Sequence, residues 1–153
     1  MTSITTTSQG VAGSAWRVRL IGLAIALICA APLGIALWLT PSVSGEGTHE
    51  QLGLPPCSTL MFTGWPCPTC GWTTTFALTM HGRPLEAVLV QPAGALMSFG
   101  CIAAFFGGLY MLWTGISLWP MVSGWFTRSS LLWPAVIVLL SWAYKAALVK
   151  GVL

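Results

Sequence analysis

Residues 20–39 read LIGLAIALICAAPLGIALWL, an apolar run without a charged side chain. A helix needs about 20 mostly apolar residues to cross about 30 Å of hydrocarbon. Two further segments, 93–119 and 131–149, approach or exceed that length. Because a chain inside lipid must satisfy its backbone hydrogen bonds internally, all three are expected to be helices. We therefore predict an all-α integral membrane protein, with three transmembrane helices in a single domain over residues 20–153.

The composition of the chain supports this fold class and excludes several functions. Charged residues make up 6% of the sequence and the mean hydropathy is +0.82, which is too apolar to coat a soluble globule. The sequence has no phosphate-binding loop, no paired carboxylates and no basic patch for nucleic acid. We expect the lipid bilayer as a partner and no nucleic acid, and we predict neither catalytic residues nor a cofactor.

The residues around the first span indicate its orientation. Residues 1–19 are predicted to form a disordered cytoplasmic tail. Arg17 and Arg19 precede the span, whereas residues 40–82 contain no Lys or Arg, so the N-terminus should be cytoplasmic. This places the cysteine segment on the outer side of a bacterial plasma membrane and Arg128 on the inner side. A cleaved signal peptide is the alternative, but the apolar run exceeds the usual signal length, which favours a retained anchor.

Residues 64–73, GWPCPTCGWT, hold most of the chemically reactive groups of the chain. Cys67 and Cys70 form a Cys-x-x-Cys motif, and Cys57 precedes it. The interpretation we favour is a structural disulfide among these three, as is common in an oxidising compartment. We do not expect a metal site, and haem attachment is excluded because Gly71 rather than His follows the motif.

Two other interpretations of the cysteines remain open. In a thiol–disulfide oxidoreductase, Cys67 would attack, Cys70 would be its partner and Cys57 would act as a relay. In a zinc site, the Cys-x-x-Cys motif would supply half of the ligands and Cys57 a third. His49 and His81 are the candidates for a fourth ligand, and neither spacing is convincing.

The residues after the motif predict two short helices. Residues 71–81 carry apolar side chains on one helical face, and Pro84 can begin a second helix that stops before Pro92. The first helix, at about 1.5 Å per residue, is too short to cross a bilayer. We predict that residues 57–92 form a re-entrant or interfacial hairpin.

Small residues recur every four positions in the first two spans, which permits close approach of helix backbones. These stripes should pack either against each other or against a partner subunit or a second copy. Their residues are Gly22, Ala26, Ala30 and Gly34 in the first span and Gly100, Ala104 and Gly108 in the second.

The cysteine motif resembles that of a family of small bacterial membrane proteins called domain of unknown function 2752. The family pattern runs Cys, Gly-x-x-Cys-Pro-x-Cys-Gly-x-Thr-Arg, Gly-Asp, Ala and Asn-Pro. The matching residues are Cys57, Gly64, Cys67, Pro68, Cys70, Gly71, Thr73, Gly82, Ala87 and Pro92. The glycines, the prolines and Thr73 are expected to be structural. The chain departs from the pattern at Thr74, Arg83 and Gln91, where the family has Arg, Asp and Asn.

The resemblance implies a membrane fold rather than an activity. If the family's Arg and Asp form a buried pair, replacing both is tolerable, whereas replacing one would strand a charge. Together these features predict a non-catalytic accessory or assembly subunit of a membrane complex. The thiol–disulfide oxidoreductase and the zinc site are the alternatives.

Overall fold

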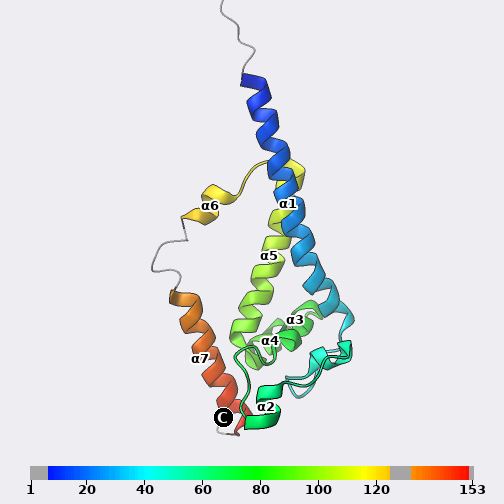
Figure 1. The fold of residues 1–153 in the computed structure, drawn as a ribbon, viewed down its shortest axis with the longest axis vertical. Coiled ribbons are helices and arrows are strands. Elements are labelled where there is room, and N and C mark those ends of the chain that lie inside the picture. Colours follow the sequence, from blue (N-terminus) through cyan, green and yellow to red (C-terminus); the bar gives the residue numbers. More distant parts are fainter. Residues whose placement is uncertain (1–6, 125–131, 152–153) are drawn as a thin grey trace, which may run out of the picture.

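A computed structural model describes residues 7–124 and 132–151, and every regular element in these two ranges is a helix (Figure 1). The predicted all-α fold class is confirmed. The elements are α1 (Thr7–Trp38), the 3-10 helix η1 (Thr48–Leu52), α2 (Ser58–Thr63), α3 (Trp72–Met80), α4 (Pro84–Val90), α5 (Pro92–Thr114), α6 (Trp119–Ser123) and α7 (Leu132–Val149).

Three helices are long and apolar enough to cross a membrane, as predicted, and their apolar surfaces suit contact with lipid. These stretches are Ala15–Trp38, Pro92–Thr114 and Leu132–Val149. The second is shorter than the predicted 93–119, because Gly115 adopts a left-handed φ of 71° and its N–H closes the helix on the carbonyl of Met111. Residues 115–119 of the predicted range therefore lie outside the span.

Helix α1 begins earlier than predicted. It includes residues 7–19, which we had assigned to a disordered tail, and residues 1–6 lie outside the described part of the chain. Once a stable apolar helix has formed, extending it costs less than starting a new one, which accounts for the additional turns. Arg128, used in the orientation argument, also lies outside the described residues.

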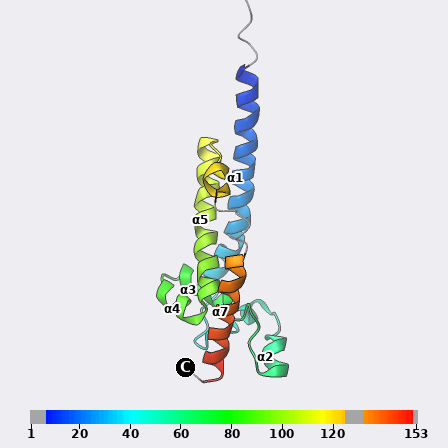
Figure 2. The same ribbon diagram turned by 90° about the vertical axis from the view of Figure 1, so that its left-hand side faces the viewer.

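Helices α1 and α5 lie side by side over most of the length of α5, as both views show (Figures 1 and 2). A methyl group added at Gly22 would lie 2.6 Å from the carbonyl oxygen of Gly108, and one at Gly108 would lie 2.9 Å from the backbone nitrogen of Ala26. These members of the two predicted stripes therefore pack against each other within the chain. In contrast, nothing lies within 4 Å of a methyl group added at Gly34 or Gly100.

The two short helices predicted after the cysteine motif are α3 and α4, and both pack on the start of α5. Gly71 and Gly82 adopt left-handed φ angles of 89° and 73° at the two bends, while Pro84 and Pro92 begin α4 and α5. The hairpin itself is confirmed, and its depth relative to a bilayer remains a prediction.

Candidate functional site: the cysteine cluster

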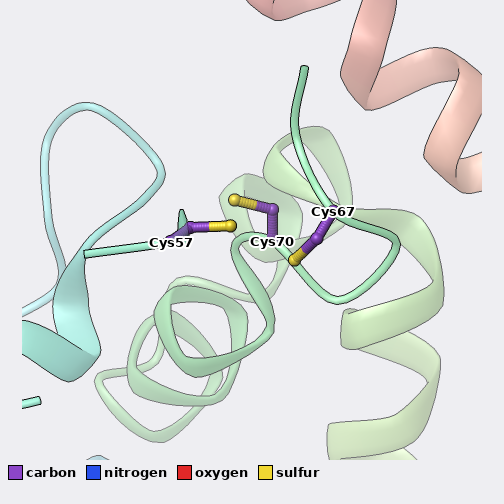
Figure 3. Close-up of side chains that lie close together, drawn as sticks. All are labelled: Cys57, Cys67 and Cys70. Atoms are coloured by element: carbon purple, nitrogen blue, oxygen red, sulfur yellow. The ribbon is translucent and has the colours of Figure 1, made fainter. Parts of the chain in front are cut away.

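The sulfur atoms of Cys57, Cys67 and Cys70 all lie within 4.8 Å of one another. Figure 3 shows the sulfurs of Cys57 and Cys70 directed toward each other, with that of Cys67 beside them. We call these three residues the cysteine cluster. The sequence correctly grouped them. Cys29 and Cys101 lie elsewhere, where the Cys101 thiol donates to the carbonyl of Cys29 at 3.7 Å.

Two different segments supply the sulfurs of the cluster. Cys57 is the residue before α2, and Cys67 and Cys70 are the ends of a turn closed by a hydrogen bond from Cys70 N to Cys67 O at 3.0 Å. Pro68 occupies the second position of this turn, which proline's fixed φ favours. The helix after the turn begins only at Trp72.

Gly71 brings the linker after α1 against the cysteine turn. A methyl group at Gly71 would lie 2.9 Å from the carbonyl oxygen of Gly45, and the φ of 89° also disfavours any side chain. The linker is thus packed against the motif. Thr48, also in the linker, is fully buried and shares a 2.8 Å hydrogen bond with Thr74.

All five cysteines are unbridged in the structure, so the predicted disulfide stays a prediction. The Cys67 sulfur lies 3.4 Å from the hydroxyl of Thr69. The thiol of Cys70 donates to a carboxylate oxygen of Glu46 at 3.9 Å. An ionisable group therefore adjoins the cluster, which the sequence had not indicated.

Glu46 is itself held by a lysine from the last helix. Lys145 Nζ lies 3.3 Å from Glu46 Oε1 and donates to the carbonyl oxygen of Gly45, also at 3.3 Å. The Lys145 side chain is only 5% exposed, so its ammonium is buried within the protein. The sequence did contain a signal for this contact. Lys145 is an ionisable residue within an apolar span, and such residues generally have a partner.

The environment shifts the pKa values of two cluster thiols in opposite directions. Burial, together with the nearby charge of Glu46, raises the pKa of Cys70 to about 12. Burial also acts to raise the pKa of Cys57, but hydrogen bonding with the backbone of Leu60 and with Cys67 outweighs it and lowers that pKa below its usual value. In the reduced, metal-free protein, Cys57 is therefore the readier thiolate and Cys70 stays protonated.

Helix α7 holds the loop that carries the cluster. Trp142 Nε1 donates to the carbonyl oxygen of Pro66 at 2.8 Å. The Ser141 hydroxyl donates to Gln91 Oε1 at 2.9 Å, and Gln91 Nε2 donates to the carbonyl oxygen of Pro68 at 3.1 Å. The carbonyls on both sides of Cys67 are thus bonded, directly or through Gln91, to α7. Sequence reasoning missed these contacts because it treated α7 only as an apolar span.

A comparison with protein families identifies the segment that contains the cluster. Residues 57–105 match the family described as "Protein of unknown function (DUF2752)". The resemblance drawn from the motif is confirmed, and the match extends past Pro92 into α5. No curated protein and no solved structure matches the chain. Helices α1 and α7 lie outside the DUF2752 match, although both pack on it.

The three departures from the DUF2752 pattern have separate surroundings. Thr74 is fully buried against Thr48. Arg83 is half exposed and forms an ion pair with Glu86, three residues later. The fully buried Gln91 links Pro68 to α7. Thr74 and Arg83 thus have different partners and do not contact each other as a pair. Gln91 connects the cysteine turn to α7.

The remaining motif residues have positions that suit structural roles. Gly64 ends α2 with a left-handed φ of 67°. Thr73 lines a largely apolar pocket of about 240 Å³ between α1 and α3. The two histidines are bonded to backbone carbonyls, His49 to Pro55 at 3.2 Å and His81 to Ala77 at 2.8 Å.

Proposed function

We propose that the protein is a non-catalytic accessory or assembly subunit of a membrane complex, in which the cysteine cluster fastens the extramembrane segments together. The observation that carries this proposal is the attachment of the cysteine loop to α7 on both sides of Cys67. A loop held in this way is suited to maintaining a shape, because the backbone on both sides of Cys67 is fixed by bonds to other elements.

Unused helix surface supports a role in assembly. Gly34 on α1 and Gly100 on α5 have open space around them. The other glycines of the stripes, Gly22 and Gly108, are buried in the contact between α1 and α5. A neighbouring helix can therefore approach the backbone closely at Gly34 and Gly100. Lipid covers whatever apolar surface a partner leaves free.

The proposal includes the orientation indicated by the sequence, with the N-terminus in the cytoplasm and the cluster outside a bacterial plasma membrane. Labelling intact cells with a membrane-impermeant maleimide tests this orientation. Cluster cysteines should be labelled after reduction and chelation, whereas Cys101 inside α5 should not. If the cluster were labelled only after cell lysis, the cluster would lie on the cytoplasmic side and the proposed orientation would be wrong.

Purification from native membranes in mild detergent tests the accessory role. We expect the chain to co-purify with another membrane protein at a fixed ratio, and a free monomer as the sole species would contradict the proposal. Gly34→Val and Gly100→Val should weaken this association while leaving the monomer folded, since both glycines are exposed and a Cβ atom added at either meets nothing within 4 Å. Leu109→Val, at an exposed position on the opposite face of α5, is the matched control.

A thiol–disulfide oxidoreductase is the second candidate, favoured by the carboxylate of Glu46 beside the Cys70 thiol. A carboxylate in this position can accept the proton of a buried thiol during exchange. Cys57, whose pKa is lowered, would then take the attacking role that the sequence suggested for Cys67. Thiol trapping at a series of redox potentials separates the candidates, because only the oxidoreductase requires a disulfide that mild reductants open.

A further inference from the structure

We propose that Cys57, Cys67 and Cys70 bind one Zn²⁺ ion as thiolates. Two thiolates on a tetrahedral zinc ion, each with a bond of about 2.3 Å, lie about 3.8 Å apart. The three sulfurs of the cluster lie within 4.8 Å of one another, which accommodates that separation for all three pairs. This inference rests on the proposed structural role of the cluster, and it replaces the disulfide as the fastening.

The number of sulfurs favours a metal ion over a disulfide. A disulfide joins two sulfurs at about 2.05 Å and would leave the third thiol of the cluster unused. A zinc ion uses all three. The ion also joins two segments of the chain. Cys57 lies at the start of α2, whereas Cys67 and Cys70 lie in the turn before α3.

The turn from Cys67 to Cys70 is suited to supplying two ligands. Its hydrogen bond from Cys70 N to Cys67 O sets the backbone, and Figure 3 shows both side chains extending from this turn toward Cys57. The hydrogen bonds from Trp142 to the carbonyl of Pro66 and from Gln91 to the carbonyl of Pro68 fix the backbone on both sides of Cys67. Ligands fixed in this way need little rearrangement to bind an ion.

The charges around the cluster suit the bound ion. Binding of Zn²⁺ by three thiols releases three protons to solvent and forms three metal–sulfur bonds, which leaves a net charge of −1. Glu46 adds a second negative charge beside Cys70, and Lys145 compensates it at 3.3 Å. No oxidation or reduction is involved.

Three protein ligands leave one position of a tetrahedral zinc ion for water or for an external donor. The nearest candidates in the sequence, His49 and His81, are instead bonded to the carbonyls of Pro55 and Ala77. The carboxylate of Glu46 is paired with Lys145 and is not among the ligand atoms that lie within 4.8 Å of one another. The fourth position is therefore assigned to water in the isolated chain.

The first test measures metal and thiols in the full chain, purified in detergent under nitrogen without added metal. We expect one zinc per chain by elemental analysis. The number of cysteines that react with maleimide in mild, non-unfolding detergent should rise by three when a chelator is added, with no reductant present. Absence of zinc, or a rise that requires reductant rather than chelator, would overturn the proposal. Copper or iron in place of zinc would overturn the choice of ion.

The second test identifies the ligands with Co²⁺, which replaces Zn²⁺ and absorbs in the near ultraviolet when bound by thiolates. The chelated full chain should gain this absorption with one Co²⁺, and Cys57→Ser, Cys67→Ser and Cys70→Ser should each weaken it by about a third or abolish binding. Cys29→Ser and Cys101→Ser are matched controls that should keep the full signal. Loss of the signal in the controls, or its retention in a cluster variant, would contradict the assignment. Should a cluster variant fail to fold, the zinc and thiol counts of the unmodified chain decide.

These results are separable from the proposed function. A chain that co-purifies with a partner but holds no zinc refutes the metal site and keeps the accessory role. A zinc-containing chain found solely as a monomer does the reverse.

Discussion

The ammonium of Lys145 lies 3.3 Å from the carboxylate of Glu46, so the last helix is joined to the linker that follows the first one. Glu46 in turn accepts a hydrogen bond from the Cys70 thiol. The cysteine cluster, the linker and α7 are therefore connected through Glu46 and Lys145. A substitution of either charged residue should affect all three parts.

Lys145→Met should destabilise the protein by about 3 kcal/mol, because removing one member of a buried pair leaves the other charge without compensation. Glu46→Gln combined with Lys145→Met should recover much of this loss. The free energy of unfolding, measured by titration with SDS in mixed micelles, tests both variants in a double-mutant cycle.

The exposed pair of Arg83 and Glu86 supplies the control for that cycle. Both side chains are about half exposed, at 51% and 50%. Solvent screens such pairs, so Arg83→Gln should leave the unfolding transition unchanged. Equal effects of Arg83→Gln and Lys145→Met would show that the Glu46 pair is not buried in the folded protein.

Gly108→Ala should destabilise α1–α5 packing by about 1–3 kcal/mol, because the new methyl group forces the two backbones apart. It would lie 2.7 Å from the carbonyl oxygen of Gly22. Gly100→Ala on the same helix meets nothing within 4 Å and should be neutral or slightly stabilising. The same SDS titration compares the two. A neutral Gly108→Ala would mean that the helices are not in close contact there.

Much of the fold could be predicted from local patterns. The apolar runs predicted three spans, Pro84 predicted where the second short helix begins, and Pro92 predicted where it stops. The linker could not be predicted in the same way. Its buried Thr48 bonds to Thr74, 26 positions away, and no local sequence pattern indicates such a contact. The end of α5 was also missed, since the apolar run continues past Gly115 although the helix does not.

Ser141→Ala should cost about 1–3 kcal/mol, because it leaves two buried groups without partners. The hydroxyl of Ser141 donates to Gln91 Oε1 and accepts from the backbone nitrogen of Ala93, each at 2.9 Å. Thr63→Ala removes a hydroxyl that donates to the carbonyl of Thr59 and accepts from the backbone nitrogen of Trp65. Both bonds are exposed to solvent, so the effect should stay within about 0.5 kcal/mol. Denaturant unfolding of both variants checks the difference. Similar values for the two would argue against a role of Ser141 in holding α7.

The candidate site was predictable in its cysteines but not in its surroundings. Motif spacing grouped Cys57, Cys67 and Cys70 correctly, because a Cys-x-x-Cys turn places its own two sulfurs near each other. Glu46 and Trp142 reach the site only through the tertiary fold. Glu46, outside the motif, therefore contributes with burial to keeping the Cys70 thiol protonated.

The two shifted thiols should react in a fixed order in the reduced, chelated protein. At about pH 8.5, near the unperturbed cysteine pKa, iodoacetamide should modify Cys57 before Cys70. The reason is that only thiolates react, and the pKa of Cys57 is lowered whereas that of Cys70 is raised to about 12. Peptide mass spectrometry over a pH series follows each site separately.

Glu46→Gln should speed the modification of Cys70, because the Glu46 charge is the second cause, after burial, of its raised pKa. The pH at which Cys70 becomes reactive should fall, while its burial keeps it above the pH at which Cys57 reacts. Glu86→Gln, which removes a carboxylate that is paired with Arg83 on exposed α4, is the matched control and should leave the Cys70 profile unchanged. If Glu46→Gln also left the Cys70 profile unchanged, the charge of Glu46 would have no effect on the pKa of the Cys70 thiol. Burial alone would then explain the protonation of Cys70.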